Sequence, residues 1–282
     1  MKKLLSLALS LAVTLSLAAC GGGDPAPSNN QTPSAPPSEK VATDLEYVQG
    51  NGVLKIGYTD FAPMNYTDEN GEFVGFETEF ATAVCEKLGL EPEFVEINWD
   101  SKTMELESKR IDCIWNGMTI TPELQEALSI GDPYIKNYQV VVIRSADADK
   151  YKTTADLSGA DIQAEAGSAG EAAIQADENL SKATYNSVDK QTSALLEVKT
   201  GGADACVLDF VLAGAMVGVG NYSDLMVIPD LQLSVEEYGV GFRKGSDIVP
   251  EFNAAMQALI EEGTLNEIAV KYDLDKLLLA NQ

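Results

Sequence analysis

The sequence contains no histidine, and this absence removes several kinds of chemistry at once. Without His among its 282 residues, the chain cannot build a Ser-His-Asp triad, a Cys-His pair, a histidine zinc site or an imidazole acid–base catalyst. Cations are scarce as well, because 19 Lys and Arg stand against 44 Asp and Glu, which gives a net charge of −25. A surface of that charge repels phosphate backbones and anionic lipid, so we expect no nucleic-acid partner.

Cysteines are few and far apart. Beyond Cys20, the chain has only Cys85, Cys113 and Cys206, with no C-x-x-C pair. That spacing indicates neither a disulfide framework nor a metal or redox site, so we expect no metal and no cofactor. Cys113 and Cys206 lie in apolar runs typical of strands, which favours buried thiols, and a Cys85–Cys113 bridge is left open.

Long hydrophobic runs are also missing. The apolar run from Leu4 to Leu17 follows two lysines, and it is too short for a confident membrane span. It ends in Leu17-Ala18-Ala19-Cys20, which resembles the start of bacterial lipoproteins, where the cysteine is lipidated and becomes the first mature residue. The alternative is an ordinary signal peptide with an incidental cysteine.

The segment after this start is rich in Pro, Ser, Gly and Asn, which is typical of a disordered tether. We therefore expect residues 1–20 to form a lipoprotein signal peptide and residues 21–43 a tether. The rest of the chain is long enough for one large domain or two lobes. It would lie outside the cytoplasmic membrane, anchored to the membrane through lipidated Cys20.

Apolar segments of strand and helix type alternate from residue 53 onward. Phe76, Phe80, Val84 and Leu88 recur at every fourth position, which predicts one helix face, and Gly89 is a natural stop. Such alternation predicts parallel sheets with helices on both faces. Strands are expected at 53–58, 92–97, 113–115, 138–143, 161–164, 205–208 and 240–242, and helices at 76–88, 101–109, from 168, 189–199, 250–262 and 265–272.

Two polar residues follow short apolar strands in the two halves of the chain. Asn116 follows Asp112-Cys113-Ile114-Trp115, and Asp209 follows Asp204-Ala205-Cys206-Val207-Leu208. In open α/β sheets, ligands bind beyond the carboxyl ends of the strands. The two residues are therefore candidates for a ligand site, and the alternative is that each caps the following helix.

Several segments match one known family in order and spacing. They are IGYTDFAPM (56–64), NGEFVGFE (70–77), IDCIWNGMTITPE (111–123), DPY (132–134), LSG (157–159), AGSAG (166–170), DACVLD (204–209) and YGVGFRKG (238–245). Together they resemble the bacterial extracellular solute-binding proteins of family 3, the polar-amino-acid receptors of ABC importers. The resemblance runs from Gly52 to about Tyr272.

The resemblance implies a two-lobed α/β fold of the periplasmic-binding-protein kind, type II, in which the ligand lies in the cleft between the lobes. Two crossover strands, placed near 135–139 and 232–238, would act as the hinge when the lobes close. Residues 44–136 and 236–282 would form lobe one, and residues 137–235 lobe two. The implied function is a monomeric receptor that delivers an amino acid to the permease of an ABC importer.

The resemblance also implies residues that grip the ligand. Asp209 matches the acid that pairs with the ligand ammonium. Gly117 and Thr119 match positions whose backbone N–H and hydroxyl face the ligand. Ser168, just after Gly167, matches a helix N-terminus whose amides point at the ligand carboxylate.

Other residues of the implied cleft carry an alternative role. Phe61 matches an aromatic that lies along the ligand side chain, but a core role is the alternative. Trp115 and Asn116 end a strand near the cleft, and Trp115 is either cleft wall or core. Asp60 adds a second acid in the loop that holds Phe61.

One position departs from the family pattern. The family reads Thr-x-Thr-x-Glu-Arg, where the Arg clamps the ligand carboxylate with two parallel hydrogen bonds, but this chain has Leu124 at the Arg position. Lys102 is a candidate replacement for the missing charge, and the alternative is a solvated helix residue. A pocket with Asp60 and Asp209 but no Arg also suits an amine or a cationic ligand.

Two further functions are weighed beside transport. One is a dehydratase-like enzyme on the same fold, which would use carboxylates such as Asp60, Glu165 or Asp209 for proton transfer. The other is a tethered sensor that reports a solute to a membrane kinase. Because no independent catalytic signature is found, no catalytic residue and no enzyme activity are expected.

Overall fold

The computed structural model describes residues 42–282. Cys20, the signal peptide and nearly all of the predicted tether therefore lie outside the described residues, and those expectations stay predictions. No helix within 42–282 has the length and apolar character needed to cross a bilayer.

The strands of residues 42–282 form two five-stranded sheets and one two-stranded ribbon. The order in the first sheet is β4 (Glu91–Glu96), β1 (Val53–Tyr58), β5 (Cys113–Ile114), β12 (Gly241–Arg243) and β6 (Leu128–Ile130). The order in the second is β11 (Leu225–Tyr238), β7 (Ile135–Arg144), β10 (Ala205–Asp209), β8 (Asp161–Glu165) and β9 (Thr184–Val188). The ribbon pairs β2 (Tyr66–Thr67) with β3 (Phe73–Val74).

The prediction of parallel sheets is only partly right, because both sheets are mixed. Strands β4, β1 and β5 run parallel, as do β10, β8 and β9. Strand β12 runs antiparallel to its neighbours in the first sheet, and β7 runs antiparallel to both of its neighbours in the second. Strand β7 is the segment that carries the chain into the second sheet, and β12 follows β11, the segment that carries it back.

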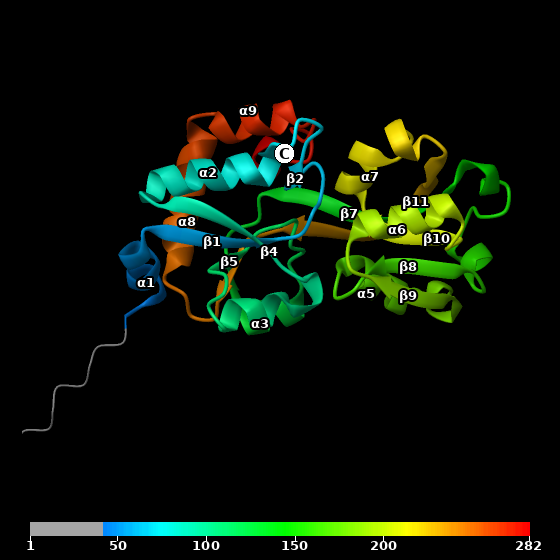
Figure 1. Cartoon of the computed structure of the whole chain (residues 1–282), viewed down its shortest axis with the longest axis horizontal. Helices are drawn as coiled ribbons and strands as arrows, with labels where there is room; N and C mark the ends of the chain where they lie inside the picture. Colours follow the sequence, from blue (N-terminus) through cyan, green and yellow to red (C-terminus); the bar gives the residue numbers. More distant parts are fainter. Residues whose placement is uncertain (1–41) are drawn as a thin grey trace, which may run out of the picture. The chain divides into compact units, whose positions relative to one another are not determined.

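Helices cover both faces of the first sheet, and we call this unit the first lobe. Figure 1 shows α2 (Phe76–Leu88) and α9 (Thr264–Lys271) on one side of β1 and α3 (Lys102–Glu107) on the other. Helix α8 (Ile248–Glu261) packs against α2 and α9. The predicted face of α2 is confirmed, because Phe76, Phe80 and Val84 are fully buried and Gly89 ends the helix at φ 69°.

The second sheet with its helices forms the second lobe. Helices α6 (Gln191–Thr200) and α7 (Phe210–Met216) share a core with Val140 and Val142 of β7. Helix α5 (Ala169–Ala176) shares a separate core with Val141 and Ile143. Successive side chains of a strand point to opposite faces, so the run 138–143 is covered on both faces, as the sequence predicts.

Helices α1 (Asp44–Asn51), α4 (Pro122–Ala127) and α7 go beyond the predicted pattern. Helix α1 buries only Val48 and α4 buries no side chain, so neither has an apolar periodicity to detect. An ion pair instead anchors helix α1, because Arg243 Nε lies 2.7 Å from Asp44 of the helix. Asp112 holds the same guanidinium, with Nη2 at 2.9 Å.

The two crossover segments lie side by side. Strands β7 and β11 pair antiparallel from Ile135↔Tyr238 to Arg144↔Leu225. The predicted lobe boundaries at 136/137 and 235/236 fall inside these strands. The cysteines take no part in bridging, because Cys85, Cys113 and Cys206 are buried thiols without disulfides. The Cys85–Cys113 bridge that the sequence left open is not formed.

Candidate ligand-binding site

A cavity of about 300 Å³ is lined by both lobes. It lies at strand ends, because Glu165 ends β8, Asp209 ends β10, and Asn116 comes shortly after β5. The first lobe contributes Phe61, Trp99, Asp100, Lys102, Thr103, Asn116, Gly117, Met118, Thr119, Thr121, Glu123 and Leu124, and the second contributes Glu165, Gly167, Ser168, Ala169, Ala172, Gln191 and Asp209.

Asp209 precedes helix α7 without capping it, because its side chain makes no cap hydrogen bond. Its carboxylate is instead the centre of a buried network. Its Oδ1 accepts from Gln139 Nε2 at 2.8 Å, from the Tyr238 hydroxyl at 2.6 Å and from Asn137 Nδ2. Its Oδ2 accepts from Gln191 Nε2. The helix-cap alternative for Asp209 is therefore excluded.

A second carboxylate shares this network. Glu236 Oε2 accepts from the same two amides, Asn137 Nδ2 and Gln139 Nε2, each at 3.1 Å. Burial, followed by the neighbouring charge of Glu236, raises the pKa of Asp209 to about 6. The network ties β10 to both crossover strands, because Asn137 and Gln139 lie on β7 and Glu236 on β11.

Glu165 is the other carboxylate at a strand end of the second lobe. It is only 3% exposed, and its Oε1 finds no hydrogen-bond donor among the described residues. Burial, and then the charge of Asp209, raises the pKa of Glu165 to about 8, while Lys102 acts in the opposite direction. From the sequence, Glu165 is predicted only as a possible acid for proton transfer, not as a ligand contact.

Gly117 and Thr119 line the cavity, but their polar groups are already used by the protein. The Gly117 amide donates to both carboxylate oxygens of Glu77, at 3.1 and 2.9 Å. The Thr119 hydroxyl donates to Glu236 Oε2 at 2.9 Å. The expected role of the Gly117 amide as a donor to the ligand is thus corrected, because a buried carboxylate takes that N–H.

Glycine is required at position 117 on steric grounds. Its φ is +58°, and a Cβ there would lie 2.4 Å from Phe61 Cε1. Phe61 is 2% exposed and lines the cavity, so it is a buried aromatic of the cleft wall. Asn116 is also held internally: its Oδ1 accepts from the Thr59 amide at 3.1 Å, and its Nδ2 donates to the Thr59 carbonyl at 2.9 Å.

The predicted helix start at Ser168 is present and faces the cavity. Ser168 Oγ accepts from the Glu171 amide at 3.2 Å, which caps α5. Ala169, the first residue of the helix, lines the cavity. The first amides of a helix have no acceptor within it, and the helix dipole favours an anion there. This end of α5 can therefore receive a carboxylate.

Lys102 is not a solvated helix residue. It is 8% exposed, and its Nζ donates to the carbonyl of Trp99 at 3.2 Å and to that of Gly167 at 2.9 Å. The same Nζ lies 4.9 Å from the centre of the Trp99 ring. Burial lowers the pKa of Lys102, and the neighbouring carboxylates, Glu165 first among them, oppose that shift.

The bond from Lys102 to Gly167 joins the two lobes across the cleft. A second link is the ion pair between Lys190 of the second lobe and Glu96 of the first. Gly167 itself, at φ +68°, approaches so closely that a Cβ would lie 3.0 Å from Asp100 Cα. These contacts bridge the two lobes across the cleft.

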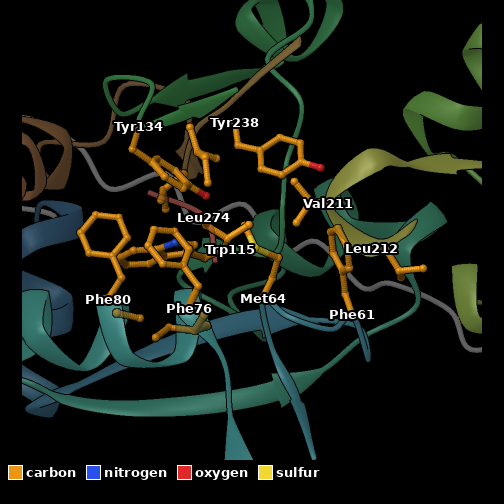
Figure 2. Packing of buried hydrophobic residues seen from close by; sticks show 14 of the residues in the cluster. Phe61, Met64, Phe76, Phe80, Trp115, Tyr134, Val211, Leu212, Tyr238 and Leu274 are labelled. Atoms are coloured by element: carbon orange, nitrogen blue, oxygen red, sulfur yellow. The ribbon is translucent and has the colours of Figure 1, made fainter. Parts of the chain in front are cut away.

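Trp115 and Asp60 do not line the cavity. Trp115 is fully buried on the opposite side of the chain from Asn116, where it meets Phe80 and Phe252 edge to face with ring centres 5.0 and 5.2 Å away. Figure 2 shows Trp115 next to Phe80, within the aromatic core. The structure therefore corrects the proposed cleft role of Trp115 to a core role.

Asp60 lies in a separate depression with Tyr58, Glu96 and Lys190. Its neighbour Phe61 lines the main cavity, and adjacent side chains of extended backbone point in opposite directions. The proposal of Asp60 as a ligand contact in the cleft is corrected accordingly.

The cavity is acidic. Among the described residues that line it, Asp100, Glu123, Glu165 and Asp209 are the carboxylates and Lys102 is the only cation. Leu124 occupies the position where the family pattern has Arg, and it is half-buried against the apolar cluster that includes Trp99. Within 42–282, no three or more His, Cys, Asp or Glu side chains are clustered as metal ligands would be.

Trp99 and Gln191 line the cavity without having been predicted. Trp99 is 7% exposed and lies three residues before Lys102. An aromatic residue just before a short helix was the only sequence feature that could have suggested its place in the cavity. Gln191 opens α6, and its partner Asp209 is 18 residues away. No local pattern predicts that contact.

Comparison with known proteins decides the family. The profile described as "Bacterial extracellular solute-binding proteins, family 3" matches residues 54–275. This chain belongs to that family. Its structural relatives are two-lobed amino-acid-binding proteins of the periplasmic type II fold, which confirms the predicted fold class.

Individual relatives cover most of the chain. The L-cystine-binding protein TcyJ of Escherichia coli K12 is 26% identical over 230 residues, or 81% of this chain and 85% of that protein. The arginine-binding extracellular protein ArtP of Bacillus subtilis 168 is 26% identical over 276 residues, or 96% and 98%. A mutant of ArgBP from T. maritima has a TM-score of 0.75 at 32% identity and covers 82% of this chain and 99% of that one.

Proposed function

We propose that this protein is an extracytoplasmic receptor that captures one amino acid in the closed cleft and hands it to the permease of an ABC importer. The observation that carries the proposal is the cavity of about 300 Å³, which has an acid, Asp209, and a helix start, Ala169, on the same lobe. That volume is at the lower end of small-molecule sites. A zwitterion needs both an anion and a set of free donors, and this lobe offers both.

The ammonium would bind Asp209 through Oδ2, which accepts only one hydrogen bond from the protein. The ligand carboxylate would bind the amides at the start of α5. Phe61 and Trp99 would lie along the apolar part of the ligand. Closure by Lys102 and Gly167 then buries the ligand between the lobes.

A second candidate is an amine without a carboxylate. Leu124 favours the amine, because no Arg is present at that position to bind a ligand carboxylate. Lys102 cannot fully replace that Arg, since it already donates two of its three hydrogen bonds to backbone carbonyls. Calorimetric titration of L-arginine, L-lysine, L-histidine and L-cystine, each against its decarboxylated amine, separates the candidates. The amino-acid proposal expects binding of at least one amino acid and a loss of tenfold or more for the amine, since charge-assisted hydrogen bonds contribute about 1.5–3 kcal/mol. Leu124→Arg should widen that gap.

Delivery and anchoring complete the proposal. We propose that Cys20 is lipidated, so the wild type should partition with membranes and incorporate palmitate, while Cys20→Ala should be released or left unprocessed. An unlabelled wild type that stays with membranes would contradict anchoring. We propose no enzyme activity, since both curated relatives compared above are named as binding proteins. Turnover of prephenate or arogenate would contradict that.

A further inference from the structure

Glu165 lines the cleft with one buried carboxylate oxygen, Oε1, that no hydrogen-bond donor of the described residues reaches. It ends β8 and is 3% exposed. A buried carboxylate oxygen without a hydrogen bond costs free energy until a donor or a proton satisfies it. The ligand is the natural source of that donor.

Asp209, the neighbouring buried carboxylate, differs from Glu165 because both of its oxygens accept hydrogen bonds from the protein. Strands β8 and β10 are adjacent and parallel, with Ile162 opposite Ala205, so Glu165 and Asp209 leave the same edge of the sheet. Neighbouring strands lie about 4.8 Å apart, which places both carboxylates within reach of one small ligand. Asp209 accepts hydrogen bonds from Asn137, Gln139, Gln191 and Tyr238, whereas Glu165 Oε1 accepts none.

Lys102 does not serve as the missing partner. Its Nζ donates to the carbonyls of Trp99 and Gly167, and its contacts hold the lobes together. Its single charge also stands against four carboxylates on the cavity wall. The charge of Lys102 acts on Glu165 from a distance, but no hydrogen bond or ion pair joins the two side chains among the described residues, so Oε1 stays free for a donor on the ligand.

We infer that Glu165 receives a cationic group on the ligand side chain, so that the cleft selects an amino acid with a charged side chain over a neutral one of the same shape. This inference rests on the proposed amino-acid receptor function. It agrees with the raised pKa of Glu165, about 8, because burial keeps a proton on this carboxyl at neutral pH. A ligand cation displaces that proton.

The test compares L-arginine with L-citrulline, whose neutral urea group replaces the guanidinium, and L-lysine with its neutral isostere L-norleucine. Calorimetry is carried out on the wild type, on Glu165→Gln and on the control Glu86→Gln, which removes an exposed carboxylate that does not line the cavity. The wild type should bind at least one cationic amino acid about tenfold or more tightly than its neutral isostere. Glu165→Gln should abolish that preference, and Glu86→Gln should keep it.

Proton release on binding provides a second test of the role of Glu165, and this test uses only the wild-type protein. Binding of the cationic amino acid at pH 7 should release protons from the wild type, seen as a dependence of the calorimetric enthalpy on the buffer, and binding of the neutral isostere should not. Equal affinity for both members of each pair, or tighter binding of the neutral ones, overturns the inference. So does an equal loss for both members in Glu165→Gln, which would mean that Glu165 serves the α-ammonium.

Failure of the receptor function itself would look different. In that case the wild type would bind none of the amino acids or amines in the screen. Binding of neutral amino acids without cationic preference would leave the receptor function standing and remove only the role of Glu165.

Discussion

The two walls of the cleft use their polar groups in different ways. On the first-lobe wall, the Gly117 amide and the Thr119 hydroxyl are consumed by the protein's own carboxylates. What remains for a ligand is the aromatic surface of Phe61 and Trp99 and two exposed carboxylates, Asp100 and Glu123. This wall gives the cavity its shape.

The second-lobe wall has polar groups that the protein leaves free to bind a ligand. It holds the unpaired Oε1 of Glu165, the partly used carboxylate of Asp209 and the start of helix α5. The proposed function assigns the selection of ligand charge to the buried carboxylates of the second lobe, and ligand shape and closure to the first lobe.

Replacing Asp209 should have the largest effect. Asp209→Ala removes the ammonium partner and about 1.5–3 kcal/mol of binding, or 10- to 100-fold in affinity. It also strands the buried donors of Gln139, Gln191 and Tyr238, so the melting temperature should fall as well. Asp209→Asn, which keeps the shape, should lose affinity with a smaller loss of stability. Unchanged affinity in both variants, measured by calorimetry, would show that the ammonium binds elsewhere.

Gly117→Ala tests the first-lobe wall. A Cβ at φ +58° and 2.4 Å from Phe61 must displace that ring, at a cost of about 1–3 kcal/mol in the free energy of unfolding. Affinity should fall for charged and neutral ligands alike, because shape and not charge is disturbed. Gly159→Ala is the matched control, since a Cβ there meets nothing within 4 Å. Denaturant unfolding of the two variants side by side should separate them, and equal stability would contradict the steric argument.

Lys102→Met removes the bond that joins the lobes through the Gly167 carbonyl. Because that bond stabilises the closed form whatever the ligand, affinities for amino acids and amines should all fall by about the same factor, near tenfold. A loss confined to ligands with a carboxylate would instead make Lys102 the substitute for the missing Arg. Lys152→Met, at an exposed surface ion pair, should leave affinity unchanged.

The raised pKa of Glu77, which accepts hydrogen bonds from the Gly117 amide, leads us to expect that stability depends on pH. Burial raises its pKa from 4.5 to about 7, so the folded state binds its proton more tightly than the unfolded state. The stabilising contribution is therefore full below about pH 4.5 and is lost as the pH rises toward 7, by about 1.4 kcal/mol per unit. Glu77→Gln should flatten this part of the curve of melting temperature against pH, while Glu86→Gln, at an exposed position of the same helix, should not. An unchanged slope in Glu77→Gln would show that this carboxyl is charged in the folded protein.

Periodic apolar segments could be predicted from the sequence because their burial follows one rule per element. The face of α2, the two-sided burial of 138–143 and the start of α5 at Ser168 all follow from local spacing. Helix α1 was not predicted, because an ion pair between Asp44 and Arg243 anchors it and it makes few apolar contacts.

The site was harder to predict because its contacts join distant segments. The sequence gives no sign that the Gly117 amide is taken by Glu77, 40 residues away, or that Lys102 meets the Gly167 carbonyl, 65 residues away. Trp115 and Asn116 are neighbours in the chain, yet one faces the core and the other the cavity. Which of two adjacent residues faces the cleft depends on tertiary packing.

A crystal structure of the protein with the tightest-binding amino acid from the calorimetric screen tests the division of the cleft most directly. The account predicts the α-ammonium on Asp209, the carboxylate at the start of α5 and a side-chain cation within hydrogen-bond distance of Glu165 Oε1. A ligand whose charged groups bind the first-lobe wall, or one that leaves Glu165 facing an apolar chain, would contradict it.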